Sequence, residues 1–359
     1  MSRIEASLLS KIEGSDSSQE RALLRCRLAI YYFHKGDCGR AARLVDEVRN
    51  WARSNEALDV TVYINLAEAT DRFQSAQTIA ALEKAKRAFA LSSASGKNNL
   101  IGLSAIWLAH LEFNEGHYAD AVKLTQLCLK TVDQAEFLTR IRCHTLVADL
   151  LSFCGKVSDA TSWYTKARVA AVDEGDEIAV GQIIYNSASF RFNNVRLLRA
   201  CGKEIREELS FVEMMIASSS HYDVGVESSA FKSFLPMLNA QLLMLRGDYI
   251  NSARIFSQWL NSSDVVVDVR VRRLCQVDYS FCMASLDDVT QAVKILDEID
   301  AKDEIVVPPD EVAIAYHQRS LIHSIIGDSV KAKRCLDRSE AALEEHERVQ
   351  SEILSLISL

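Results

Sequence analysis

The side chains best suited to chemistry in this 359-residue sequence are eight histidines, nine cysteines and a basic stretch at 191–209. No histidine stands at metal-ligand spacing beside a carboxylate or a cysteine pair, so neither a metal site nor a cofactor is expected. Cys143 and His144 are adjacent, but neighbouring helical residues point about 100° apart and form no nucleophile–base pair. The sequence contains no P-loop, dinucleotide-binding, nucleophile-elbow or zinc-protease motif. We therefore predict a protein that is not an enzyme.

The basic stretch is the strongest candidate for nucleic-acid binding. Its sequence, RFNNVRLLRACGKEIREEL, places basic side chains around a glycine at Arg191, Arg196, Arg199, Lys203 and Arg206. Three glutamates in the same stretch offset these charges, and the net charge of −8 on the whole chain repels a phosphate backbone. We interpret the stretch as a solvent-exposed turn, and the smaller cluster at Arg270, Arg272 and Arg273 as an exposed face. Direct binding of nucleic acid is not expected.

Composition indicates a helical, cytoplasmic protein. Hydrophobic residues make up 48% of the chain and charged residues 25%, whereas the 13 glycines and 3 prolines are too few for many short strands. The cysteines are scattered through apolar segments without a CxxC pair, which is typical of reduced core thiols in the cytoplasm. The opening MSRIEASLLSKIEG is interrupted by charges, so it does not resemble a signal peptide, and no uncharged apolar run is long enough to span a membrane.

A repeat of about 40 residues organises the chain. Five segments share an apolar helix, a glycine turn and a small residue five positions later. Their turn glycines are Gly36, Gly116, Gly155, Gly247 and Gly327. The separations of 80, 39, 92 and 80 residues correspond to one or two repeat lengths. Such a repeat predicts stacked helix pairs, each of which covers the apolar faces of its neighbours.

The small residues locate the remaining units. Ala41, Ala81, Ala121 and Ala160 are 40, 40 and 39 residues apart, and Ser252, Ala292 and Ala332 are 40 and 40 apart. A small residue at this point lets the two helices of a pair approach closely, while glycine supplies the turn conformation. The predicted turns lie near Gly36, Ala76, Gly116, Gly155, Gly202, Gly247, Asp287 and Gly327. The fifth unit is the most divergent, because Glu207 occupies its small-residue position.

The pattern resembles the tetratricopeptide repeat. Matching positions in the first unit are Leu28-Ala29, Tyr32, Gly36-Asp37, Ala41, Val45 and Val48. In the third unit they are Leu108-Ala109, Gly116, Tyr118, Ala121, Thr125 and Cys128, and in the fourth Val147-Ala148, Gly155, Ala160, Tyr164 and Ala167. The units depart from the family in running to about 40 rather than about 34 residues and in lacking its early tryptophan and closing proline. In unit length they are also similar to the helical-repeat sensor domains of maltose-regulator-type and peptide-pheromone-type bacterial regulators.

The resemblance implies an all-α fold, a right-handed superhelix (α-solenoid) of about eight antiparallel helix pairs. We expect residues 1–17 to form a lead-in helix and 18–359 a single repeat domain, with the most divergent unit at about 178–218. Two β-branched runs compete with this interpretation. For DVVVDVRV at 264–271 the repeat register favours a helix capped by Ser263 or Asp264, and for EIVV before Pro308-Pro309 we expect a connecting loop.

The resemblance also implies which residues line the concave surface, since in this family the first helix of each pair does so. The lining positions that could contact a partner are His110, Phe113, Asn114, Arg142, Asp149 and Phe153, joined by Asn186 and Arg191 of the fifth unit. Aromatic side chains with amide and guanidinium donors suit a peptide or a partner helix. The alternative is that the apolar members of this set are inter-repeat core, which would leave the polar ones as the better candidates.

Two functions remain open. The first is a non-enzymatic scaffold or adaptor that binds a peptide or partner segment in the concave groove. The second is a ligand- or peptide-responsive regulatory module of a bacterial signalling or transcription system. The sequence identifies neither the partner nor the oligomeric state.

Overall fold

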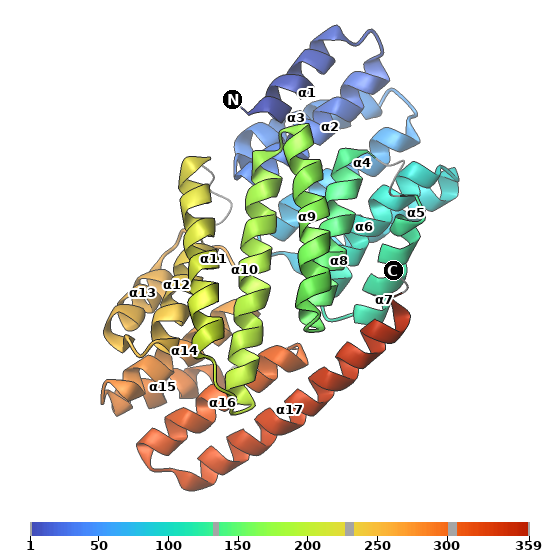
Figure 1. Ribbon diagram of the computed structural model, residues 1–359. Helices are drawn as coiled ribbons and strands as arrows, with labels where there is room; N and C mark the ends of the chain where they lie inside the picture. Colours follow the sequence, from blue (N-terminus) through green and yellow to red (C-terminus); the bar gives the residue numbers. More distant parts are fainter. Residues whose placement is uncertain (1, 132–135, 227–232, 301–306, 358–359) are drawn as a thin grey trace. The chain divides into compact units, whose positions relative to one another are not determined.

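The computed structural model describes residues 2–131, 136–226, 233–300 and 307–357. These residues form seventeen α-helices and no strand (Figure 1). The first helix, α1 (Arg3–Gly14), precedes a series of helix pairs that follow one another along the chain. The prediction of an all-α chain of about eight helix pairs is therefore confirmed. Within the described ranges, no helix is both long enough and apolar enough to cross a membrane.

The chain divides into two compact units. The first comprises Met1–Ser187, Tyr222–Ala230 and Ile353–Leu359, and the second comprises Ala188–His221 and Phe231–Glu352. The pairs of the first unit are α2 (Ser18–Lys35) with α3 (Cys38–Ala52), α4 (Leu58–Gln74) with α5 (Thr78–Ser95), α6 (Asn98–Asn114) with α7 (Tyr118–Leu129), and α8 (Phe137–Phe153) with α9 (Val157–Glu174). Those of the second are α12 (Phe234–Leu245) with α13 (Tyr249–Asn261), α14 (Val269–Ser285) with α15 (Val289–Asp300), and α16 (Pro309–Ile326) with α17 (Ser329–Leu356). Residues of α10 (Glu177–Ala200), α11 (Arg206–Gly225) and α17 belong to both units.

All eight predicted turn residues adopt the left-handed backbone conformation. Six are glycines, and the two that are not, Ala76 and Asp287, have φ values of 55° and 62°. At each turn the next residue donates its backbone N–H to the carbonyl five positions back, over 2.8 to 3.0 Å. This bond satisfies a carbonyl that the helix end leaves without an internal partner. The same hydrogen bond forms after Ala76 and Asp287. There it offsets the steric cost of a side chain in a conformation that favours glycine.

The small residues after the turns are packed against the preceding helix. Six of the seven, all except Ala332, retain at most 2% of their surface. Ser252 shows how closely the helices approach, because its hydroxyl donates to the carbonyl of Ala240 at 2.7 Å. A larger side chain would have to push the two helices apart.

We expect Ala121→Leu to lower the free energy of unfolding by roughly 1 to 3 kcal/mol, because Ala121 is fully buried at the start of α7 and has no room for three further carbons. Lys123→Leu is the control on the same helix, since its side chain is 66% exposed, and it should change stability by about 0.5 kcal/mol or less. Urea unfolding followed by circular dichroism measures both. Equal losses at the two positions would contradict close packing at Ala121.

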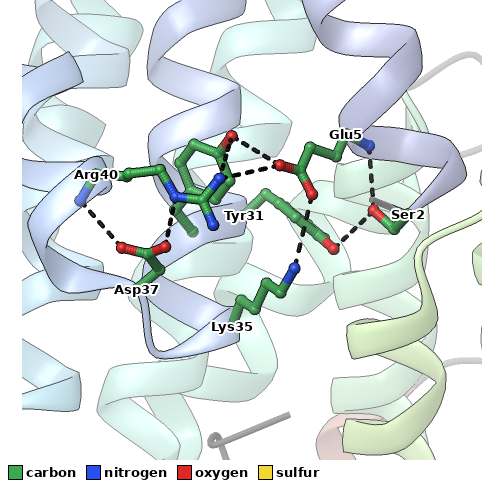
Figure 2. A network of polar contacts seen from close by, with 7 residues as sticks. Ser2, Glu5, Tyr31, Lys35, Asp37 and Arg40 are labelled. Carbon is green, nitrogen blue, oxygen red and sulfur yellow. Dashed lines mark hydrogen bonds and ion pairs between the residues drawn. The ribbon is translucent and has the colours of Figure 1, made fainter. Parts of the chain in front are cut away.

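A buried polar network holds α1 against α2 and α3 (Figure 2). Glu5 of α1 is 4% exposed, and its Oε1 accepts a hydrogen bond from the Tyr32 hydroxyl at 2.9 Å. Arg40 Nη1 lies 3.3 Å from the same oxygen, and Lys35 Nζ lies 3.6 Å from Oε2. Two cations and a hydroxyl thus compensate the carboxylate that α1 buries.

The second unit also contains a buried ion pair. Asp278 of α14 is fully buried and accepts hydrogen bonds from Arg196 Nη2 of α10 at 2.6 Å and from Gln241 Nε2 of α12 at 2.8 Å. Burial raises the pKa of Asp278, and the charge of Arg196 opposes that rise. One carboxylate therefore connects three consecutive first helices.

The prediction that the basic stretch forms a solvent-exposed turn is correct only for its end. Lys203 and Arg206 are exposed, whereas Arg196 is 8% exposed because α10 continues to Ala200 and directs this side chain at Asp278. The prediction that Arg270, Arg272 and Arg273 form an exposed face is also wrong. Arg270 pairs with Glu311 at 3.2 Å, and its side chain is 16% exposed.

The helix expected over 264–271 begins only at Val269. Its N-cap is Asp268, whose side chain accepts the Arg270 backbone N–H at 2.7 Å, rather than Ser263 or Asp264. Residues 265–268 have no regular secondary structure, and Arg272 donates to the Val265 carbonyl at 3.2 Å. The side-chain cap from Asp268 and the hydrogen bond from Arg272 to the Val265 carbonyl thus stabilise a later helix start than the repeat register predicts. The EIVV run lies largely outside the described residues, and α16 begins at Pro309 with Pro308 as its N-cap.

All nine cysteines are free thiols, but not all of them are in the core. Cys38 and Cys201 are exposed and Cys335 is partly exposed, while the other six are buried. Cys38 is the first residue of α3 and Cys201 directly follows α10, so both lie at turns, where the helix pairs cover less of each side chain.

Candidate functional site

The first unit contains seven of the eight predicted partner-binding residues. They lie on three first helices: His110, Phe113 and Asn114 on α6, Arg142, Asp149 and Phe153 on α8, and Asn186 on α10. Arg191, also on α10, belongs to the second unit. There its guanidinium forms an ion pair with Glu208 and lies 5.6 Å from the centre of the Phe211 ring.

Arg142 lies at the centre of the polar residues of the first unit. Its guanidinium stacks on the Trp107 ring, with 3.6 Å between Cζ and the ring centroid, and its Nη2 donates to His34 Nε2 at 2.7 Å. Gln182 of α10 approaches the other ring nitrogen of His34 at 3.2 Å. We call these four residues, His34, Trp107, Arg142 and Gln182, the Arg142 cluster. It brings together side chains of α2, α6, α8 and α10.

The hydrogen bonds of the cluster determine the protonation of His34. A guanidinium only donates, so Nε2 must accept and the neutral ring must carry its proton on Nδ1. Gln182 can accept that proton only with its amide oxygen. The side-chain amide of Gln182 must therefore be flipped, so that its Oε1 rather than its Nε2 faces His34 Nδ1. Burial, followed by the charge of Arg142, holds the pKa of His34 well below its usual value. His34 is therefore a neutral partner for Arg142.

Burial also lowers the pKa of Arg142 itself, although the side chain stays protonated at neutral pH. Desolvation lowers the pKa of this guanidinium to about 9, an effect that Asp176 partly opposes. The Asp176 carboxylate accepts the Ala179 backbone N–H at 2.9 Å at the start of α10 and forms no ion pair with Arg142 among the described residues. In the part of the chain that the structure describes, no carboxylate lies within ion-pair distance of Arg142.

Asp149 and Asn186 are joined to each other. Asp149 is 2% exposed, and it accepts hydrogen bonds from the Tyr164 hydroxyl at 2.7 Å and from Asn186 Nδ2 at 3.0 Å. Burial raises the pKa of Asp149 to about 7, although both hydrogen bonds favour the ionised form. This carboxyl group therefore orients Asn186 and carries only part of a negative charge at neutral pH.

His110 and Asn114 lie one turn apart on α6 and contact each other. Asn114 Nδ2 is 2.7 Å from the His110 carbonyl and 3.3 Å from His110 Nε2. The His110 ring packs edge-on against Phe73, and burial lowers its pKa to about 3. Both side chains are partly exposed.

The two aromatic candidates are mostly enclosed. Phe113 and Phe153 are 8% and 6% exposed, and their ring centres are 5.9 Å apart. Both also pack against Tyr118, whose ring centre is 4.7 Å from that of Phe153. The structure thus places these rings in the packing between repeats, whereas four of the polar members, His110, Asn114, Arg142 and Asn186, are partly exposed.

Sequence reasoning missed His34, Trp107, Asp176 and Gln182. For His34 a signal was present, because it lies two residues before the Gly36 turn, as Asn114 does before Gly116 and Phe153 before Gly155. The other three could not be found from the repeat, because no equivalent residue type recurs in the neighbouring units. Among the described residues, no group of three or more His, Cys, Asp and Glu side chains is placed to bind a metal ion.

Comparison with solved structures agrees with the helix-pair architecture. A Rap protein in complex with competence and sporulation factor is 10% identical, with a TM-score of 0.62 over 96% of this chain and 92% of that one. The chain has a divergent tetratricopeptide-like helical-repeat fold. A Rap conjugation gene regulator of the plasmid pLS20, in complex with the Phr* peptide, is 15% identical, with a TM-score of 0.57 over 99% of this chain and 92% of that one. No protein-family model and no curated protein sequence matches significantly.

Proposed function

We propose that this helical-repeat chain is a non-enzymatic scaffold or adaptor that binds a peptide, or an extended segment of a protein partner, on the first helices of its first unit. The observation that carries the proposal is the grouping of His110, Asn114, Arg142 and Asn186 on three neighbouring first helices. Amides can bond to a peptide backbone whatever its sequence. The proposed site of action is the cytoplasm, where the nine free thiols would remain reduced.

The two Rap structures support a bound ligand, and one of them supports a peptide. One was solved with competence and sporulation factor and the other with the Phr* peptide, and each covers nearly all of this chain. The second is a gene regulator, which favours a variant of the same proposal: the chain is a peptide-responsive regulatory module, in which binding changes the action of the protein on a further partner.

The test is selection of peptides from a random octapeptide library displayed on phage, followed by titration of the enriched peptides. We expect Asn114→Ala to weaken their binding by about 2- to 12-fold, the effect of losing a neutral hydrogen bond worth about 0.5 to 1.5 kcal/mol. Lys123→Ala on α7 is the control, because its side chain is largely exposed and belongs to a second helix. If no peptide is enriched, or if binding depends on Lys123 and not on Asn114, the proposal is wrong.

A further inference from the structure

We propose that Arg142 binds a carboxylate of the ligand, so that the peptide or partner segment recognised by this chain carries a negative charge at the position that meets the Arg142 cluster. The inference rests on the proposed function and specifies the chemistry of its ligand. The supporting observation is the environment of the Arg142 guanidinium, which contacts Trp107 and His34.

The guanidinium lacks the partner that its surroundings demand. A charge removed from water is costly unless an opposite charge and hydrogen bonds compensate it. Arg142 is only partly exposed, its Cζ lies over the Trp107 ring, and the one hydrogen bond found for it in the described residues is to the neutral His34. A guanidinium has five N–H groups, so most of its hydrogen-bonding capacity remains for a ligand.

Two buried acidic groups of the first unit, Asp176 and Asp149, have other hydrogen-bond partners. Asp176 uses its carboxylate to cap α10, accepting the Ala179 N–H at 2.9 Å. Asp149 is occupied by Tyr164 and Asn186 at 2.7 and 3.0 Å. Neither lies within 4 Å of the guanidinium as an ion-pair partner, so an external anion would meet no competing internal carboxylate.

The charges around Arg142 favour a carboxylate over a phosphate. Stacking on Trp107 restrains the orientation of the guanidinium, which can then make a two-pronged contact with an anion. A phosphate dianion would need a second cation, and the nearby imidazoles, His34 and His110, are kept neutral by burial at neutral pH. One cation with neutral neighbours fits one monoanion.

The carboxylate site can be tested without knowledge of the peptide. The probe is N-acetylglycine, with N-acetylglycinamide as its neutral counterpart, and the readout is the NMR signal of the Trp107 indole N–H, on whose ring Arg142 is stacked. We expect a saturable shift with the acid and none with the amide. Arg142→Gln, which keeps an amide donor near His34, should abolish the shift while the backbone amide spectrum shows the fold intact.

Arg140→Gln is the matched control. Arg140 lies on the same helix and its guanidinium is also stacked on an aromatic ring, 4.4 Å from the centroid of Phe137. This variant should retain the shift caused by N-acetylglycine. An unsaturable response in the wild-type protein, or equal saturation in the wild type and Arg142→Gln, would overturn the inference.

Peptides enriched by phage display then identify the source of the carboxylate. Each is compared with a version amidated at its C-terminus and with versions in which Asp or Glu is replaced by Asn or Gln. We expect one of these neutralisations to weaken binding by roughly tenfold or more, and to have no further effect on Arg142→Gln. Peptides that bind equally well without any carboxylate would overturn the inference and leave the proposed function standing. If no peptide is enriched, the proposed function fails, while the N-acetylglycine titration still decides whether Arg142 binds a carboxylate.

Discussion

Arg196→Ala should lower the free energy of unfolding of the second unit by about 3 to 5 kcal/mol, the loss expected when one partner of a buried ion pair is removed. The side chains of Arg196 and Asp278 are 8% and 1% exposed, and they are joined at 2.6 Å. Without Arg196, Asp278 would retain only amide donors such as Gln241 against the cost of a buried charge. Urea unfolding at neutral pH, followed by circular dichroism, measures the loss.

Two further variants test the cause of this loss. Arg246→Ala removes an arginine whose ion pair with Glu213 is exposed, at 49% and 41%, and it should cost about 1 kcal/mol or less. The double substitution of Arg196 and Asp278 by Ala should destabilise by less than the sum of the two single changes, because no uncompensated charge remains. Additive losses would mean that Arg196 contributes through packing alone.

The free energy of unfolding of Asp149→Asn should increase relative to that of the wild type as the pH rises from about 4 to about 7. Burial raises the folded-state pKa of Asp149 to about 7, from its ordinary value of 3.8. In that interval the folded wild type binds a proton that the unfolded chain has lost, so the contribution of this group to stability is full below pH 3.8 and disappears as the pH rises through 7. Because the variant has no titrating group there, the difference in unfolding free energy should shift in its favour by about 4 kcal/mol over the interval.

His110→Gln should show the opposite trend. The pKa of His110 is lowered to about 3 in the folded state, so its contribution to stability is present above pH 6.5 and is lost as the pH falls through 3. Urea unfolding of both variants and the wild type between pH 4 and pH 8 provides the measurement. A difference between Asp149→Asn and the wild type that is independent of pH would show that Asp149 is ionised throughout this range in the folded protein.

The local architecture was predictable because it is written in a short repeat. The spacing of the turn glycines and small residues placed all eight turns, including those at Ala76 and Asp287, where glycine is absent, and each of the eight residues adopts a positive φ. The same spacing identified the buried faces, as Ala121 and Ala160 show. Such features follow from sequence because the two helices of a pair are neighbours in the chain, so that periodicity alone relates their contacting residues.

The predictions from sequence were wrong where a single side-chain interaction, rather than the repeat, determines the local structure. The register predicted a helix from residue 264, but Asp268 begins it at Val269 with its own side-chain cap. The stretch around Arg196 was interpreted as exposed because local charge patterning contains no information about Asp278, 82 residues away. For the same reason Cys38 and Cys201 could not be distinguished from core thiols by the composition of their segments.

By itself, the sequence determined the helix pairs, their turns and the helices that bear the candidate site. Only the tertiary structure brought His34 to Arg142 across 108 residues and stacked that guanidinium on Trp107. It also decided which groups are charged, since the pKa values of Asp149 and His110 depend on burial by neighbouring helices. The physical reason is that helix formation and pairing depend on residues close together in the chain, whereas desolvation and ion pairing depend on all the side chains that surround a group in space.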